Sequence, residues 1–232
     1  MTNATGAYGT DLKHRVLSVA VMLALCVPII YYGGVFLLGL IAVLWVGLCW
    51  EVIKQPMSKG RAVHTVALLI LVQTLAFCVY LTLFAAPSYL FFLFFLSTLW
   101  ITDSAAYIGG KWIGGPRLAP YISPNKTWSG FVSGLVTGQM WGVGFLMLAA
   151  HLQGINLLIG LVLPIVASLS DLGQSWAKRT LGIKDTSNLI PGHGGLWDRL
   201  DSTLGTLLFF EGVYMLFPQA WRCFIASFAG AG

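Results

Sequence analysis

Residues 170–202 read SDLGQSWAKRTLGIKDTSNLIPGHGGLWDRLDS, and they concentrate charge and glycine within a largely apolar chain. The protein has 13 Lys and Arg and 8 Asp and Glu residues, and eight of these 21 charges lie in this stretch. A charge at the centre of a bilayer costs about 2.5 to 3.5 kcal/mol on insertion scales. The stretch therefore has to occupy a polar cavity or a membrane surface, which is typical of a functional site.

Two sets of polar side chains in this stretch are expected to share helix faces. Asp171, Ser175 and Lys178 follow the i, i+4, i+7 spacing, and Asp198 and Asp201 follow the i, i+3 spacing. The segment KDTSNLIPGHGG between them contains a proline and glycines that prevent a regular helix and leave backbone N–H groups free to meet an anion. Carboxylates, cations and free amides in one region indicate a metal ion together with phosphate groups.

This stretch resembles the signature of the phosphatidate cytidylyltransferase (CDP-diacylglycerol synthase) family. The family pattern is a serine, two residues, Lys-Arg, four residues, Lys-Asp, a Pro-x-His-Gly-Gly turn, and then Asp-Arg-x-Asp. The positions in register are Ser175, Lys178, Arg179, Lys184, Asp185, Pro191, His193, Gly194, Gly195, Asp198, Arg199 and Asp201. Ala177 departs from the family, which usually has a bulkier apolar residue there, and this difference concerns local packing rather than chemistry.

Residues 100–130, WITDSAAYIGGKWIGGPRLAPYISPNKTWSG, resemble the same family in two short elements. Asp103, Ser104 and Tyr107 match an Asp-Ser-x-Ala-Tyr element at a helix end. Residues 123–128 match a Ser-Pro-x-Lys-Thr-Trp element that precedes the next span. The resemblance is therefore carried by two separate blocks, and the remainder is generic membrane sequence.

The composition is that of a membrane protein. Hydrophobic residues make up 57% of the chain, charged residues 9%, and the mean hydropathy is +0.82, whereas soluble domains are roughly 25% charged. The net charge of +5 does not indicate nucleic-acid binding, because the basic residues are scattered among interhelical loops instead of forming one stripe. The four cysteines include no C-x-x-C pair, so neither a disulfide framework nor a zinc site is indicated. We expect an all-α, polytopic integral membrane protein.

Apolar runs predict about seven transmembrane helices in a single membrane domain, with N-terminal helices in residues 1–102 and the catalytic region in residues 103–232. The expected spans are 16–32, 34–50, 63–84, 88–108, 128–150, 155–177 and 203–218. The first run lacks a small-residue cleavage motif, so we expect it to be retained as a span. The first two runs are short for a bilayer that needs about 20 residues, and a tilted or partly interfacial hairpin through Gly33 and Gly34 is an alternative.

The basic residues predict the orientation. With the N-terminus in the cytoplasm, twelve of the 13 Lys and Arg residues lie on the cytoplasmic side and only Arg222 lies outside, in agreement with the positive-inside rule. The same arrangement places the loop 111–127 and the stretch 170–202 on one side. We expect a multi-pass protein of the cell (inner) membrane whose catalytic loops face the cytoplasm.

Four glycines recur every four residues in the expected span 128–150, at Gly130, Gly134, Gly138 and Gly142. Small residues on one helix face allow another helix to approach closely. Packing within one bundle is the simpler interpretation, and the seam of a homodimer is the alternative.

The family resemblance implies a Mg²⁺-dependent transfer of the cytidylyl group from CTP to phosphatidic acid at the lipid bilayer, giving CDP-diacylglycerol and pyrophosphate. Phosphoryl transfer relies on positioning and charge neutralisation more than on a protein nucleophile. Hard oxygen ligands favour Mg²⁺ over zinc. The family also implies a second cation, such as K⁺.

The expected site residues form three overlapping groups. The metal ligands are Asp171 and Asp198, with Asp201 and Asp185 as supplements. The catalytic set is Asp171, Lys178, Arg179, Lys184, Asp185, Asp198, Arg199 and Asp201. The substrate-binding set is Asp103, Ser123, Lys126, Thr127, Ser175, His193, Gly194 and Gly195.

The roles within these groups follow from charge. Cations such as Lys126 are expected to hold the phosphates of CTP and of phosphatidic acid. His193 is expected to contact substrate rather than act as a base, because a phosphate monoester with a second pKa of about 6 is already mostly ionised. Glu51 and Glu211 are left outside the site, as residues that lie at or snorkel toward the membrane interface.

Two other functions stay open at this point. A CTP-dependent lipid-alcohol kinase of related fold would share much of this chemistry without needing the full signature. A cation-binding membrane transporter would also place carboxylates within the bilayer, but transporters often carry repeated halves, and the sequence shows no such repeat. The CDP-alcohol phosphotransferases are disfavoured, because their D-x-x-D-G-x-x-A-R string does not occur.

Overall fold

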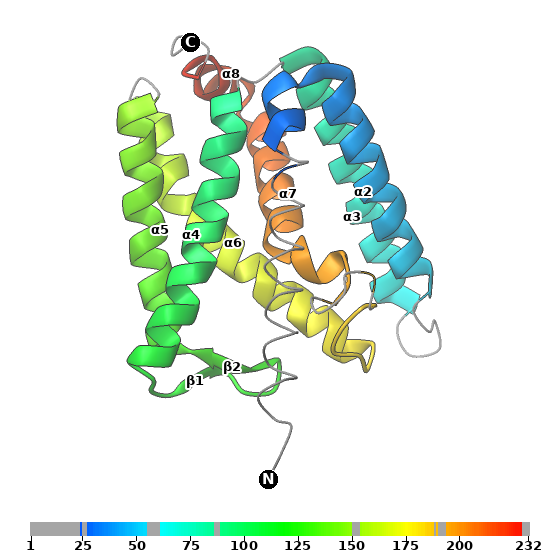
Figure 1. Ribbon diagram of the computed structural model, residues 1–232, viewed down its shortest axis with the longest axis vertical. Helices are drawn as coiled ribbons and strands as arrows, with labels where there is room; N and C mark the ends of the chain where they lie inside the picture. Colours follow the sequence, from blue (N-terminus) through cyan, green and yellow to red (C-terminus); the bar gives the residue numbers. More distant parts are fainter. Residues whose placement is uncertain are drawn as a thin grey trace.

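The computed structural model describes residues 24, 27–54, 61–85, 89–149, 154–187, 189 and 194–228. These residues form a bundle of helices with a two-stranded β-hairpin at one end (Figure 1). In chain order the elements are α2 (Gly34–Lys54), α3 (Arg61–Tyr80), the π-helical η2 (Leu81–Ala85), α4 (Tyr89–Trp112), β1 (Arg117–Ala119), β2 (Ser123–Thr127), α5 (Trp128–Ala149), α6 (Gly154–Thr180), the 3₁₀ turn η3 (Trp197–Arg199), α7 (Asp201–Leu216) and α8 (Pro218–Ala226).

Five helices in the described part of the chain are long and apolar enough to cross a membrane. They are Gly34–Lys54, Thr65–Leu83, Tyr89–Trp112, Trp128–Ala149 and Gly154–Thr180, and they correspond to the second to sixth expected spans. The prediction of an all-α polytopic membrane protein is confirmed. The count of seven is not, because the first expected span lies mostly outside the described residues and the seventh is α7, whose 16 residues are short for a bilayer crossing.

The β-hairpin follows from glycine at the end of α4. Gly114 and Gly115 have φ angles of +68° and +107°, which residues with a side chain rarely adopt. The chain then turns back as β1, which pairs antiparallel with β2 and places Arg117 opposite Thr127. This reversal returns the chain to the bundle and carries Lys126 to the same end as the last turns of α6.

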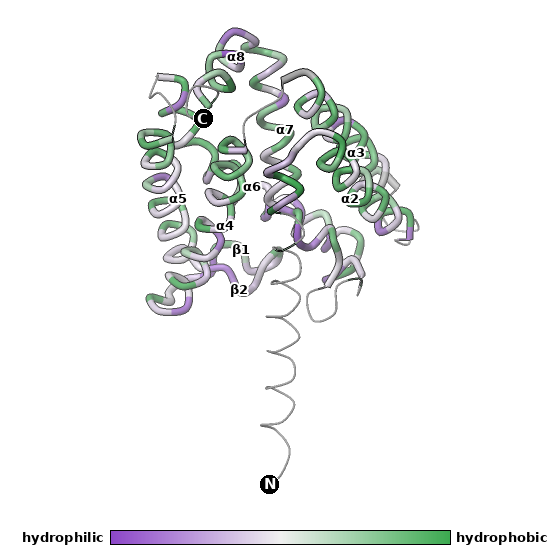
Figure 2. The backbone as a smooth tube through the Cα atoms, turned by 45° about the horizontal axis from the view of Figure 1, so that its top comes forward, coloured by the Kyte–Doolittle hydropathy of each residue, from purple (hydrophilic) through white to green (hydrophobic). Residues whose placement is uncertain are grey.

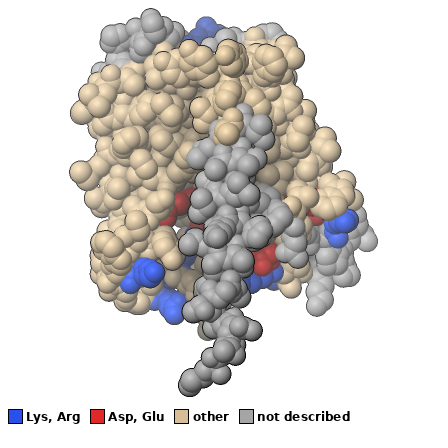
Figure 3. Space-filling model, viewed as in Figure 1, with Lys and Arg blue, Asp and Glu red and all other residues tan. Residues whose placement is uncertain are grey.

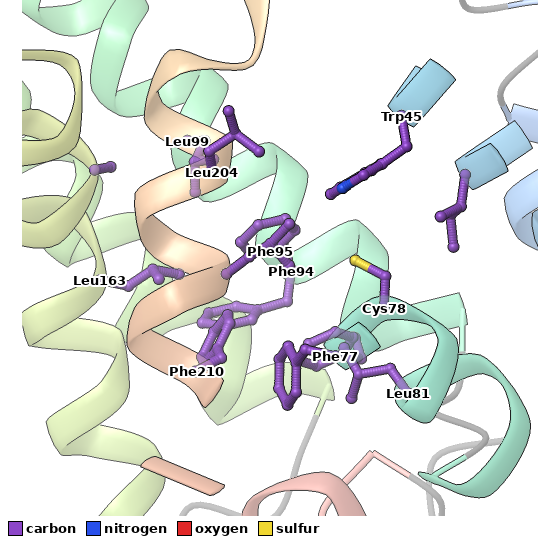
Figure 4. Close-up of a cluster of buried hydrophobic side chains, with 14 of the residues drawn as sticks. Trp45, Phe77, Cys78, Leu81, Phe94, Phe95, Leu99, Leu163, Leu204 and Phe210 are labelled. Carbon is purple, nitrogen blue, oxygen red and sulfur yellow. The ribbon is translucent and has the colours of Figure 1, made fainter. Parts of the chain in front are cut away.

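Aromatic side chains pack α4, α7 and α8 together. Phe91 of α4 lies 5.7 Å from Phe210 of α7 between ring centroids, and Phe210 lies 5.8 Å from Trp221 of α8. Figure 4 shows Phe94 and Phe95 in the same cluster of buried side chains. Such spacings are those of attractive ring pairs. Because lipid tails are as apolar as these side chains, packing rather than exclusion of water holds the helices together.

The glycine stripe of α5 packs inside the bundle, and all four of its glycines are buried. A Cβ atom added at Gly134 would lie 2.8 Å from the carbonyl oxygen of Thr102 on α4. One added at Gly142 would lie 2.9 Å from the carbonyl oxygen of Gly160 on α6. The interpretation as packing within one bundle is therefore confirmed, because α4 and α6 already occupy this face.

We expect Gly134→Val to destabilise the folded protein, whereas Gly144→Val on the same helix is tolerated. The new Cβ at 134 would overlap Thr102 and Ala106, but nothing lies within 4 Å of a Cβ at 144. Overpacking typically costs about 1–3 kcal/mol. The melting temperature of the detergent-purified protein should fall for the first variant alone, and equal melting temperatures would contradict this packing.

Charged residues gather at the end of the bundle that carries the β-hairpin. Figure 2 shows hydrophilic residues around β2 and near the end of α6. Figure 3 shows acidic and basic side chains together at this end. Arg222 lies on α8, at the opposite end (Figure 1). The expectation that the loop 111–127 and the stretch 170–202 share one side is confirmed by a direct contact, since Arg179 Nε donates to the Ile122 carbonyl oxygen at 3.2 Å.

Candidate active site

The first ion pair of the site joins α6 to the β-hairpin. The ammonium group of Lys126, on β2, donates to Oδ2 of Asp171, on α6. Both side chains keep some contact with solvent, with Lys126 30% and Asp171 24% exposed. The two sequence blocks that carry the family resemblance therefore meet in space, although 45 residues separate these two positions.

A second ion pair lies about two turns further along α6. Lys178 Nζ donates to Oδ1 of Asp198 at 2.8 Å, and these side chains are only 12% and 8% exposed. The other oxygen of Asp198, Oδ2, accepts hydrogen bonds from the Thr186 N–H at 3.0 Å, the Thr186 hydroxyl at 3.1 Å and the Gly195 N–H at 2.9 Å. Asp198 thus links two parts of the segment after α6 to Lys178 of that helix.

Glu51, on α2, organises the same segment from the first half of the chain. Its side chain is 1% exposed. Oε1 accepts from the Leu196 N–H at 2.8 Å and the Ser187 hydroxyl at 2.5 Å. Oε2 accepts from the Trp197 N–H at 2.8 Å and the Thr186 hydroxyl at 3.2 Å. Glu51 is therefore buried against residues next to the predicted site rather than exposed at a membrane surface, which the sequence interpretation did not anticipate.

A fourth carboxylate, that of Asp201, lies where α7 begins beside α6. The backbone oxygen of Asp201 accepts hydrogen bonds from the Ser170 hydroxyl and, at 2.7 Å, from Nε2 of Gln174. The neighbouring residue, Ser202, hydrogen-bonds the Asp103 side chain of α4. The ends of α4, α6 and α7 are therefore joined at the polar end of the bundle, and each supplies an aspartate there.

Two of these carboxyl groups have pKa values shifted in opposite directions. For Asp198, burial raises the pKa, but hydrogen bonds from Lys178, Thr186 and Gly195 outweigh it and hold the pKa below its usual value. For Asp201, burial raises the pKa to about 7, the charges of Asp171 and Asp103 act in the same direction, and Lys178 opposes them. Neighbouring carboxyl groups whose pKa values are shifted in opposite directions are typical of functional sites.

The other predicted residues surround these pairs. Ser175 is half-buried on α6, Lys184 and Asp185 are exposed on the segment after it, and Arg199 is exposed on η3. Ser123 and Thr127 form the two ends of β2. Thr127 also has a visible structural role, since its hydroxyl accepts the Gly130 N–H at 3.1 Å and so caps the start of α5.

The glycines of the signature lie against carboxylates of the protein itself. The N–H of Gly195 does meet an anion, but that anion is Asp198 rather than a phosphate. A Cβ at Gly195 would lie 2.8 and 2.9 Å from the two carboxylate oxygens of Glu51, so a larger residue would displace that carboxylate. Gly194 has a φ of +82°. Substrate contact by these glycines stays a prediction, and His193 lies outside the described residues.

Asp171 and Asp201 fit a divalent cation. Besides burial, the charge of Asp171 raises the pKa of Asp201, and a cation shared by the two would remove that repulsion. Asp198 is engaged differently, because both of its oxygens already accept hydrogen bonds, and its role as a metal ligand stays a prediction. Within the described ranges, no three His, Cys, Asp or Glu side chains form a ready-made metal cluster.

Glu211 is also buried, which the sequence interpretation did not anticipate. It is 6% exposed, lies on α7 and accepts a hydrogen bond from Gln73 of α3, so it belongs to the interior of the bundle. Glu51 and Glu211 share one signal, which is a lone carboxylate within an apolar run. An ionisable residue inside a membrane helix usually faces the bundle interior and has a partner, and this rule would have found both.

The chain is similar in sequence to known cytidylyltransferases. The sequence profile of the cytidylyltransferase family matches residues 75–217, which include both blocks of the site. A Brucella suis phosphatidate cytidylyltransferase is 40% identical over 138 residues, which are 58% of this chain and 51% of that protein. A Rickettsia bellii phosphatidate cytidylyltransferase is 35% identical over 161 residues, 65% of this chain and 69% of that protein.

A third relative, a Haemophilus influenzae phosphatidate cytidylyltransferase, is 39% identical over 132 residues, which are 54% of this chain and 46% of that protein. This chain thus spans about half the length of the Brucella and Haemophilus relatives. The profile covers more than half of the chain and includes every aspartate of the site. The chain belongs to the cytidylyltransferase family.

Proposed function

We propose that this protein is a phosphatidate cytidylyltransferase, which transfers the cytidylyl group of CTP to phosphatidic acid. The observation that carries the proposal is the meeting of the Lys126–Asp171 and Lys178–Asp198 pairs at the polar end of a bundle of membrane-spanning helices. A water-soluble triphosphate and a membrane lipid can meet only at such an end. The names of the relatives support the same activity.

The reaction joins two phosphates and needs charge more than a nucleophile from the protein. An oxygen of the phosphatidate monoester attacks the α-phosphorus of CTP, the bond from this phosphorus to the bridging oxygen breaks, and pyrophosphate leaves with that oxygen. The attacking oxygen is already largely ionised, since the second pKa of a phosphate monoester is about 6. The protein therefore has to bring several negative charges together and hold them in line.

The two lysines are placed for this task. Each ammonium group is held by a carboxylate at the polar end of the bundle and has further N–H donors for an incoming phosphate. Asp171 and Asp201 would hold Mg²⁺, which supplies charge neutralisation at the phosphates when it is bound. Arg179 and Arg199 add guanidinium groups at the same end. A second cation, such as K⁺, remains part of the proposal.

We place the protein in the cell (inner) membrane with this end facing the cytoplasm, where CTP is found. The support is the distribution of basic residues, twelve of which lie on one side in the predicted topology. Single cysteines introduced at 115 and 187 should both react with an impermeant thiol reagent from the cytoplasmic side of sealed vesicles. Labelling from opposite sides would exclude the arrangement proposed here.

The activity itself is tested with CTP labelled in two positions. Purified protein given α-labelled CTP, phosphatidic acid and Mg²⁺ should yield a labelled lipid, and γ-labelled CTP should release its label as pyrophosphate. Transfer of the γ-label to a lipid alcohol would instead identify a CTP-dependent lipid kinase. Failure of both reactions, with folded protein, would exclude both enzymes.

A further inference from the structure

An apolar cavity of about 460 Å³ lies between α3, α6 and α7. Its lining includes Val66 and Ile70 of α3, Trp176 of α6, Trp197 of η3, and Leu204 and Leu208 of α7. The volume falls within the roughly 300–1,000 Å³ of small-molecule binding sites. The cavity is thus large enough for part of a ligand, and its wall is almost entirely hydrocarbon.

The cavity adjoins the ion pairs but is distinct from them. Two of its lining residues, Ser170 and Gln174, donate hydrogen bonds to the backbone oxygen of Asp201. A third, Trp197, directly precedes Asp198. A molecule whose apolar part fills the cavity therefore has its polar end beside the carboxylates and lysines of the site.

We propose that this cavity binds one acyl chain of the lipid substrate. The inference rests on the proposed function, because it takes phosphatidic acid as the lipid. It adds to that function a binding site for the lipid tail that is separate from the phosphate-binding groups.

The surroundings favour a lipid chain over other occupants. Val66 is 54% exposed and lies on the candidate membrane span Thr65–Leu83, so the α3 wall of the cavity borders the hydrocarbon from which a lipid enters. A nucleotide base needs several hydrogen-bond partners, and the lining of the cavity is almost entirely apolar. An acyl chain matches this lining.

The experiment uses the full-length protein in nanodiscs and a phosphatidic acid with a photoreactive diazirine in one acyl chain. We expect crosslinks on cavity residues of α3, α6 and α7, mapped by mass spectrometry. Val66→Trp fills the cavity and should reduce this labelling at least fivefold. Leu69→Trp is the matched control, because Leu69 is 63% exposed on the same helix and does not line the cavity. Equal labelling of both variants, or crosslinks spread over the outer faces of other helices, would overturn the proposal.

The two proposals fail in different ways. If the protein does not transfer the cytidylyl group, turnover is lost with every lipid, but crosslinking still reports whether the cavity binds an acyl chain. If turnover is normal and the cavity variants show no effect on labelling, the cavity proposal alone is wrong.

Discussion

Asp171→Asn is expected to lower turnover by about 100-fold or more without lowering the melting temperature of the protein. The substitution removes a charge from the proposed metal site, and raising the Mg²⁺ concentration should restore part of the activity. It also removes the charged partner of Lys126, but both side chains of this pair contact solvent, and exposed ion pairs contribute little to stability. Initial rates across a Mg²⁺ titration, with melting temperatures in the same detergent, measure both effects.

Asp198→Asn is the matched comparison for this prediction. Asp198 is paired with Lys178 and accepts three further hydrogen bonds, so its substitution should lower the melting temperature, and added Mg²⁺ should not restore activity. Removing one partner of a buried ion pair costs about 3–5 kcal/mol. If Asp198→Asn responds to Mg²⁺ and Asp171→Asn does not, the two aspartates have the opposite roles and Asp198 is the metal ligand.

Glu51→Gln is expected to reduce turnover at least tenfold, although Glu51 lies on α2 and far from the signature in sequence. The glutamine amide offers one acceptor oxygen, and its NH₂ group faces donors that the carboxylate now satisfies, among them the N–H of Leu196 or Trp197. A buried donor without a partner costs about 1–3 kcal/mol. Hydrogen exchange at residues 195–197 should accelerate in the variant, because the backbone there loses its anchor.

Glu211→Gln is the control for this effect. Glu211 is also a buried carboxylate of the same bundle, but its partner is Gln73 on α3 rather than the segment that carries Asp198. We expect near-normal turnover and unchanged exchange at residues 195–197. If the two glutamine variants behave alike, loss of a buried charge is the cause, and Glu51 has no special role in positioning the site.

The sequence predicted the parts of this structure that depend on local composition. Apolar runs located the helices, because about 20 residues of hydrocarbon are needed to cross a bilayer. The spacing of Asp171 and Lys178 placed both on α6, and the polar signature placed Asp198 and Asp201 near them. Regular spacing and membrane solvation act over one helix at a time, and they are readable without knowledge of the fold.

The contacts across the chain were not predictable in the same way. Glu51 contacts residues more than 130 positions away, and nothing in its own helix indicates which donors it meets. The glycine segment correctly predicted an N–H that binds an anion, but local sequence did not indicate that Asp198 of the protein itself would accept from Gly195. The β-hairpin is short and irregular, and only its glycines were visible in the sequence. Such contacts depend on how the helices are arranged, which local patterns do not determine.

The position of Glu51 has a consequence for how family members can be recombined. The family profile begins at residue 75, so this carboxylate lies in the part of the chain that precedes it. The first helices are therefore not an interchangeable membrane anchor for a self-sufficient catalytic unit. A chimaera that joins residues 75–217 to another protein's N-terminal helices has the complete signature. It lacks the Glu51 carboxylate, which accepts hydrogen bonds from the backbone of that signature, unless α2 is transferred as well.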